Sequence, residues 1–212
     1  FGYEGHHALN LFSKAIAAGA SKLLALSFSP MPDDGKIKVV PPLLRPEVLA
    51  YRESPEFRDG DYILGYMLNA GFAEEVKAWH AKNPSVPLRF FWDNAAEAPV
   101  KVMDDTLSFY YLDDKEFLRQ MAGCMAYAST AGFESICEAM YLGKPLMMVP
   151  SHIEQKCNAY DATRFGAAVE SETFDLDVLL SFARDGKFRR DEGFPAWVLS
   201  AAEVFATELE SM

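Results

Sequence analysis

The stretch that decides the fold is residues 125–159, which read MAYASTAGFESICEAMYLGKPLMMVPSHIEQKCNA. Met125 to Ala128 is a short apolar run, typical of a buried parallel strand. Ser129 to Gly132 has only small side chains, which suits a turn that a ligand approaches closely. We expect a helix over 132–142 and a second strand over 146–149. A strand, a small-residue turn, a helix and another strand thus follow one another, as in a nucleotide-binding βαβ unit.

The predicted helix is amphipathic. Its apolar residues follow the spacing i, i+3, i+4, i+7, so we expect them to face the core: Phe133, Ile136, Cys137 and Met140. Ser135 and Glu138 fall on the opposite side, where we expect them to be free to meet a ligand. The start of a helix attracts anions through its unpaired N–H groups and its dipole. A diphosphate is therefore expected at this turn, beside the hydroxyl groups of Ser129, Thr130 and Ser135.

Deeper in the same crevice, three further side chains can recognise a sugar. Glu138 lies where a carboxylate can accept hydrogen bonds from ribose hydroxyls. Glu154 and Gln155 come just past the strand that ends near residue 149, and His152 precedes them in the same loop. The alternative for each residue alone is an ordinary surface helix with caps and solvated charges. The ordered set favours the nucleotide site.

In this order the residues resemble the nucleotide-sugar-dependent glycosyltransferases of the two-domain GT-B fold. The similarity is closest to the UDP-glycosyltransferases and to the N-acetylglucosaminyltransferase of peptidoglycan synthesis. The positions that match the pattern of their donor-binding half are Gly132, Ser135, Glu138, Ala139, Gly143, Pro145, Pro150, Glu154, Gln155, Asn158 and Ala159. Thr130 stands where many plant members carry a phosphate-binding His, which argues against the plant-type subgroup.

The resemblance implies a role for each matching residue. The nucleotide diphosphate would be held by Thr130, Ala131, Gly132 and Ser135, the ribose by Glu138, and the donor sugar by Glu154 and Gln155. From their places in the turn and in the loop, we also expect Ser129 at the diphosphate and His152 at a donor phosphate or the sugar. Tyr111 and Leu112 fall near the contacts to the base. Asn69 and Gly71, in the turn after an earlier strand, are a second candidate phosphate loop, although such a turn is more often only a turn. The resemblance implies no metal and no cofactor apart from the donor, a UDP-sugar or related nucleotide sugar, and a general base in a missing N-terminal domain.

Along the chain, predicted strands and helices alternate, which favours parallel βα units. We expect strands over 22–28, 62–68, 86–92, 106–110, 125–128 and 146–149, and helices over 6–18, 72–81, 115–122, 132–142 and 194–209. The predicted fold class is α/β, a Rossmann-like parallel sheet with helices on both faces and a remnant of an N-terminal domain. Residues 39–46, rich in proline, are expected to be an interdomain connection.

This reading divides the chain into three parts. Residues 1–45 would be the remnant of the acceptor domain and the linker, 46–190 the donor-binding domain, and 191–212 a C-terminal helix that closes this domain or crosses back to the first. The chain begins at Phe1, so we expect a truncated enzyme that binds nucleotide and turns over little. A sugar-nucleotide epimerase of the same architecture, or a non-catalytic nucleotide-binding module, stays open as an alternative.

Composition limits the partners. The net charge of −11 across 212 residues, with no cluster of Lys and Arg, argues against a nucleic-acid partner. The three cysteines have no CxxC spacing, which suits reduced thiols in a cytoplasm. No apolar run approaches the length of a membrane span. We expect a cytoplasmic enzyme, with contact to the inner face of the membrane only through the missing half, and a saccharide, lipid or small-molecule acceptor.

Overall fold

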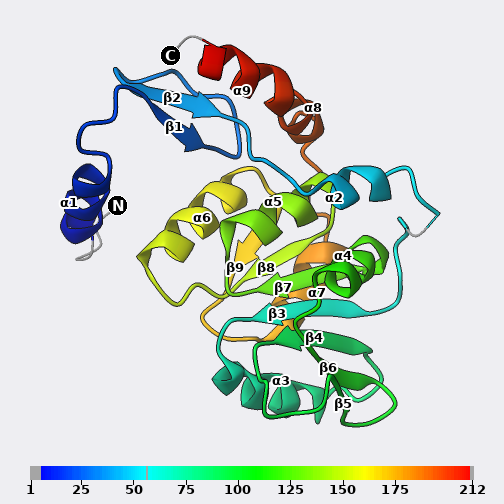
Figure 1. The fold of residues 1–212 in the computed structure, drawn as a ribbon. Coiled ribbons are helices and arrows are strands. Elements are labelled where there is room, and N and C mark those ends of the chain that lie inside the picture. Colours follow the sequence, from blue (N-terminus) through cyan, green and yellow to red (C-terminus); the bar gives the residue numbers. More distant parts are fainter. Residues whose placement is uncertain (1–5, 56, 211–212) are drawn as a thin grey trace.

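A computed structural model describes residues 6–55 and 57–210 of the chain. Its centre is a seven-stranded sheet with the spatial order β5-β6-β4-β3-β7-β8-β9 (Figure 1). The strands are β3 (Ile63–Met67), β4 (Leu88–Trp92), β5 (Val100–Val102), β6 (Leu107–Tyr111), β7 (Ala126–Ser129), β8 (Leu146–Met148) and β9 (Ala168–Glu170). All neighbours run parallel except β5, which pairs antiparallel with β6. The predicted α/β class is confirmed.

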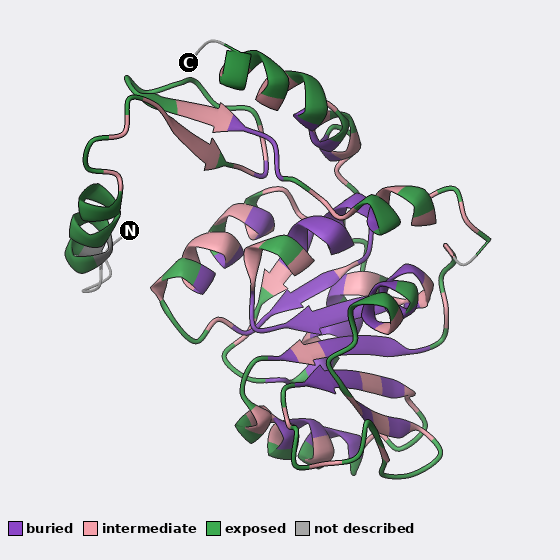
Figure 2. Ribbon diagram, viewed as in Figure 1, coloured by how far each residue is buried: buried purple, intermediate pink, exposed green. Residues whose placement is uncertain are grey.

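Helices cover both faces of this sheet. One face packs against helices α4 (Asp114–Gly123), α5 (Phe133–Tyr141), α6 (Ile153–Arg164) and α8 (Phe194–Leu199). The other packs against α3 (Ala73–His80), which follows the short 3₁₀ helix η1 (Ala70–Phe72), and against α7 (Leu176–Arg184). Side chains alternate between the two cores along each strand: in β3, Ile63 and Met67 enter one core and Leu64 the other. The buried residues accordingly concentrate in the sheet (Figure 2).

A smaller unit precedes the sheet. It contains α1 (His6–Ile16) and two parallel strands, β1 (Leu23–Leu26) and β2 (Ile37–Val40). The prediction of an irregular connection from residue 39 is wrong for Val39 and Val40, because both pair with β1. The irregular connection covers residues 41–45 and leads into α2 (Pro46–Tyr51), which packs against α4.

The C-terminal segment returns to this smaller unit. The single helix predicted over 194–209 is two helices, α8 and α9 (Ala201–Glu210), separated at Ser200. Helix α8 contacts α5, whereas α9 contacts β2, so the segment both closes the sheet domain and crosses back (Figure 1). Polar contacts with the smaller unit include Lys22 Nζ, which lies 2.8 Å from a Glu208 carboxylate oxygen, and Trp197 Nε1, which donates to Ser27 O at 3.0 Å. Residues 1–5 and 211–212, the outer ends of the first and last predicted segments, lie outside the described residues.

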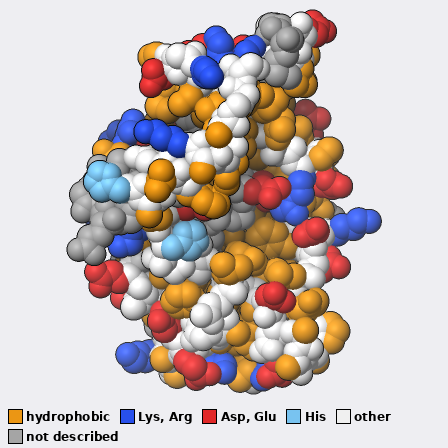
Figure 3. Space-filling view, turned by 60° about the vertical axis from the view of Figure 1, so that its left-hand side comes forward, with side chains coloured by type: hydrophobic (Ala, Val, Ile, Leu, Met, Phe, Trp, Pro, Cys, Tyr) orange, Lys and Arg blue, Asp and Glu red, His pale blue; other side chains and the backbone are white. Residues whose placement is uncertain are grey.

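Charged side chains of both signs share one face of the molecule. On the face seen in Figure 3, Lys and Arg alternate with acidic and hydrophobic side chains among the described residues. In the same part of the chain, no helix is long and apolar enough to cross a membrane. The described His, Cys, Asp and Glu residues form no group of three or more placed to hold a metal ion.

Candidate nucleotide site

The sheet reverses its direction of growth between β3 and β7. Counted along the chain, the six parallel strands lie in the spatial order 3-2-1-4-5-6, and strands 1 and 4 of this series, β3 and β7, are neighbours. The connections that follow these two strands lead to opposite sides, which opens a crevice at their carboxyl ends. Tyr66 near the end of β3 and Ser129 at the end of β7 are register partners. The segment predicted to bind a nucleotide begins at this switch point.

The turn from β7 to α5 is held in an unusual backbone conformation. Ala131 has φ = 68°, in the left-handed region that L-residues other than Gly, Asn and Asp rarely adopt. Two side chains fix it: the Ala131 N–H donates to Ser129 Oγ at 3.1 Å, and Asn158 Nδ2 donates to Ala131 O at 3.0 Å. Asn158 lies on α6, so this helix secures the turn. Such over-determined strain is commonly found at functional sites.

The N-terminus of α5 has no side-chain cap. Gly132 is the N-cap residue and makes no side-chain hydrogen bond, and Ser135 Oγ donates to Gly132 O at 3.2 Å. No side chain caps the N–H groups of residues 133–135 in the first turn. These groups, at the positive end of the helix dipole, are therefore available to a ligand. An anion at this position would meet these N–H groups directly.

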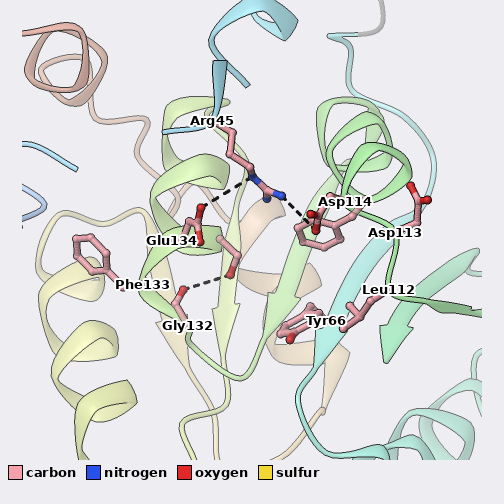
Figure 4. A pocket seen from close by; sticks show the side chains of 10 residues that line it. Arg45, Tyr66, Leu112, Asp113, Asp114, Gly132, Phe133 and Glu134 are labelled. Carbon is pink, nitrogen blue, oxygen red and sulfur yellow. Dashed lines mark hydrogen bonds and ion pairs between the residues drawn. The ribbon is translucent and has the colours of Figure 1, made fainter. Parts of the chain in front are cut away.

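A cavity of about 310 Å³ opens at this helix terminus (Figure 4). Three aromatic rings and one aliphatic side chain line it, together with three carboxylates, one guanidinium, a glycine and a serine: Tyr66, Phe117, Phe133, Leu112, Asp113, Asp114, Glu134, Arg45, Gly132 and Ser135. The N-terminus of α4 also reaches it, because Asp113 caps this helix by accepting from Glu116 N at 2.8 Å. The cavity thus offers a flat apolar wall beside polar groups and a helix N-terminus.

Glu138 does not face solvent, and the prediction that its side of α5 is free is wrong at this residue. Its side chain is 0% exposed. Arg45, from the connection before α2, donates from Nε to Glu138 Oε1 at 2.6 Å and from Nη2 to Oε2 at 2.7 Å. Burial raises the pKa of Glu138, and the hydrogen bonds from Arg45 oppose this rise. The same pairing raises the pKa of Arg45 and keeps it charged.

The predicted phosphate-binding residues divide between the cavity and the turn behind it. Gly132 and Ser135 line the cavity. Ser129, Thr130 and Ala131 are buried in the turn. Phe133, predicted to face the core, is only half-buried and also lines the cavity, with its ring centroid 4.8 Å from that of Phe28.

The predicted contacts to the base and the second phosphate loop lie at the same edge of the sheet. Leu112 lines the cavity, whereas Tyr111 at the end of β6 is 40% exposed and does not. Asn69 accepts a hydrogen bond from Gly71 N at 2.8 Å and caps η1. The Asn69–Gly71 segment is thus a capped turn outside the cavity lining.

The predicted sugar-binding residues follow the neighbouring strand, β8. His152 is the N-cap residue of α6 and, like Glu154, is exposed. Gln155 is buried, and its Oε1 accepts from Ser151 N at 2.8 Å and from Ser151 Oγ at 2.9 Å. None of the three lines the cavity, although all lie at the same edge of the sheet.

Sequence reasoning missed several cavity residues. Arg45 was placed in a linker, and its partner Glu138 is 93 positions away, so no local pattern links them. Asp113 and Asp114 were not predicted as cavity residues; Asp113 caps α4, and both line the cavity. Tyr66 carried a usable signal, because it precedes the carboxyl end of the first strand of the sheet.

Comparison with known proteins agrees with this architecture. A glycotransferase of kitacinnamycin has a TM-score of 0.59 at 14% identity, over 88% of this chain and 55% of its own. CalG4, the calicheamicin glycosyltransferase, has a TM-score of 0.54 at 14% identity, over 99% of this chain and 61% of its own. The chain therefore spans 55–61% of the length of these two proteins. No curated protein matches it in sequence.

These similarities show the fold and confirm the predicted GT-B resemblance; the particular likeness to the peptidoglycan enzyme stays a prediction. The sequence profile described as glycosyl transferase family 1 matches residues 4–185, which is most of the chain. The chain belongs to glycosyl transferase family 1.

Proposed function

We propose that this chain is the donor-binding part of a glycosyltransferase that transfers a sugar from a nucleoside diphosphate sugar, first of all a UDP-sugar, to an acceptor hydroxyl. The observation that carries the proposal is the cavity at the switch point of the sheet, with the uncapped N-terminus of α5 at its wall. Ligands of open α/β sheets bind in this crevice. Membership of the family supports the reaction class.

The geometry supports a separate binding position for each part of the donor. The diphosphate would lie at the first turn of α5, against the N–H groups of residues 133–135 and the Ser135 hydroxyl. The apolar wall formed by Tyr66, Leu112 and Phe117 would take the base, since aromatic and aliphatic surfaces accept its flat face. The sugar would extend toward β8, where Glu154 and Gln155 begin α6.

The chemistry follows from the charge that develops on the departing diphosphate. A fixed helix N-terminus stabilises this charge without reorganising during the reaction, so the proposed transfer needs no divalent ion. An acceptor hydroxyl also needs a general base. We place this base outside the residues that line the cavity, and propose that the chain alone binds the donor but turns over little.

Calorimetric titration with UDP, with other nucleoside diphosphates and with UDP-sugars tests the proposal. The expected result is saturable binding of UDP that weakens about tenfold in Ser135→Ala, because a hydrogen bond to a charged phosphate is lost. Ser181→Ala, an exposed serine on α7, is the matched control and should bind as the wild type does. Absence of binding by every nucleotide, or rapid sugar transfer by the chain alone, would contradict the corresponding part of the proposal.

A further inference from the structure

The three nitrogens of the Arg45 guanidinium are divided between Glu138 and Asp114. Nε and Nη2 are committed to the two oxygens of Glu138, at 2.6 and 2.7 Å. The third nitrogen, Nη1, lies 3.5 Å from Asp114 Oδ1, too far for a strong hydrogen bond (Figure 4). Glu138 therefore fixes one side of the guanidinium, while Nη1 on the other side makes no strong hydrogen bond to Asp114.

The two carboxylate partners of Arg45 differ in how far they are buried. The Glu138 side chain is 0% exposed, that of Arg45 is 27% exposed, and that of Asp114 is 92% exposed. A bidentate pair with a buried carboxylate holds the guanidinium in one orientation at little further entropic cost. Asp114, in contrast, is a surface carboxylate, and water can replace its contact with Nη1 at little energetic cost.

Charge around the cavity makes Arg45 the group that an anion would seek. Among the ten residues that line the cavity it is the only cation, facing the carboxylates of Asp113, Asp114 and Glu134. Glu134 Oε1 lies 4.0 Å from Arg45 Nε, so the guanidinium stands beside the first turn of α5. The uncapped N-terminus of α5 and Arg45 are thus positive features of the cavity, whereas the Asp113 carboxylate caps the N-terminus of α4.

We propose that Arg45 contacts the diphosphate of the donor through Nη1, and that Glu138 is a positioning residue that orients Arg45 for this contact. The inference rests on the proposed function and deepens it. The incoming diphosphate replaces Asp114 as the partner of Nη1, while the bonds to Glu138 stay in place. Glu138 then acts through Arg45, in contrast to the direct contact with ribose that its place in the sequence suggests.

The test compares the affinities of UDP and uridine for the intact chain by calorimetry. Arg45→Gln removes the charge but leaves the buried Glu138 carboxylate unpaired, so the double variant Arg45→Gln/Glu138→Gln is made beside it, and thermal unfolding confirms that both fold. We expect UDP affinity to fall about tenfold or more in both variants and uridine affinity to stay unchanged. Arg52→Gln is the matched control, because Arg52, at the C-terminal end of α2, also bonds α5 but at its far end, at Tyr141 O.

Two further variants separate the roles of the neighbours. Asp114→Asn removes the competing carboxylate and should strengthen UDP binding about threefold, by relieving repulsion at an exposed site. Glu138→Gln keeps one bond to the Arg45 fork and should weaken UDP binding selectively. If Glu138 contacts ribose instead, Glu138→Gln will weaken uridine and UDP equally.

The outcomes distinguish this inference from the proposed function. If the folded double variant binds UDP with the affinity of the wild type, the role of Arg45 is overturned and the proposed donor site is unaffected. Equal losses for uridine and UDP in Glu138→Gln would overturn the positioning role of Glu138. A wild-type chain that binds neither UDP nor uridine would overturn the proposed function and this inference together.

Discussion

At the scale of single residues, the β7–α5 turn combines strain with close packing. Ala131 is fully buried and has φ = 68°, yet two hydrogen bonds hold it there, one to Ser129 in the same turn and one from Asn158 on α6. A left-handed conformation costs a non-glycine residue about 1–2 kcal/mol. Glycine would relieve this cost, but would also lose a buried methyl group worth about 0.8 kcal/mol.

The first prediction follows from this balance. Ala131→Gly should change the free energy of unfolding by less than about 0.5 kcal/mol, since relief of about 1–2 kcal/mol of strain offsets the lost methyl group and the added backbone entropy, about 1.5 kcal/mol together. Ala128→Gly, at a buried position in the regular strand β7, should cost about 1.5 kcal/mol, because nothing offsets the methyl group or the added backbone entropy. Urea unfolding of the two variants measures the difference. Equal costs at both positions would contradict the account of strain.

The sequence predicts the site at this scale only in part. The small-residue turn and Ser135 were recognised, because their signals are local and chemical. The burial of Glu138 was not, since helical periodicity reports which residues share a face and not what covers that face. Here the cover is Arg45, supplied from a proline-flanked connection 93 residues earlier.

At the scale of elements, the centre of the sheet depends on a glycine. Gly65 in β3 is the register partner of Phe90 in β4. A Cβ atom added to Gly65 would lie 2.0 Å from Phe90 Cε1, so the ring occupies the space over the strand. Phe90 in turn packs edge-on against Phe174, with ring centroids 5.7 Å apart. Neither ring can shift without opening that core.

Gly65→Ala is therefore predicted to destabilise the protein by about 2–3 kcal/mol through overpacking. The free energy of unfolding in urea measures this loss. Phe90→Leu in the same chain should recover part of it, because the smaller side chain vacates the space above residue 65. Strictly additive effects of the two substitutions would show that the ring does not occupy this space.

The turn between β5 and β6 gives an element-scale prediction for pH. Asp104 accepts hydrogen bonds from Thr106 N at 2.9 Å, from Leu107 N at 2.8 Å and from His80 Nε2 at 2.9 Å. These bonds, that from Thr106 N foremost, lower the pKa of Asp104 from 3.8 to about 2. Because its pKa is lower in the folded state, Asp104 stabilises the fold above its unfolded pKa, and this stabilisation is lost as the pH falls from about 4 to about 2.

Unfolding midpoints in urea between pH 6 and pH 2 test this sign. Asp104→Asn should be less stable than the wild type at neutral pH and should lose less stability on acidification. Asp105→Asn, at the exposed neighbouring position, serves as the control and should follow the wild type. An unchanged acid response in Asp104→Asn would refute the assignment.

Several elements escaped sequence prediction: strands β2, β5 and β9 and helices α2, α6 and α7. For β2 and β5 the reason can be identified. Strand β2 ends at Val40, directly before Pro41 and Pro42. These prolines favour an irregular connection, so residues 39 and 40 were predicted as part of it. Strand β5 has three residues and is stabilised by pairing with β6 at the edge of the sheet, which no local pattern reports. Strands β3, β4, β6, β7 and β8 and helices α3, α4 and α5 were predicted because each carries its own apolar pattern.

At the scale of the whole molecule, the C-terminal helices join the smaller unit to the sheet domain. Trp197 packs against the sheet core and donates from Nε1 to Ser27 O, next to β1. Trp197→Ala should therefore speed amide hydrogen exchange in β1 and β2 while the exchange of β3 and β7 stays unchanged. Leu199→Ala, at a 61% exposed position on the same helix, is the control. Uniform acceleration across both units would contradict this tethering role.

The proposed function requires that a nucleoside diphosphate occupy the cavity at the switch point of the sheet. A crystal structure of the chain with UDP would locate the nucleotide. We expect phosphate oxygens within hydrogen-bond distance of the N–H groups of residues 133–135 and of Arg45 Nη1, with the base against Tyr66 and Phe117. UDP bound elsewhere on the sheet edge, such as at Asn69–Gly71, with the cavity left empty, would contradict it.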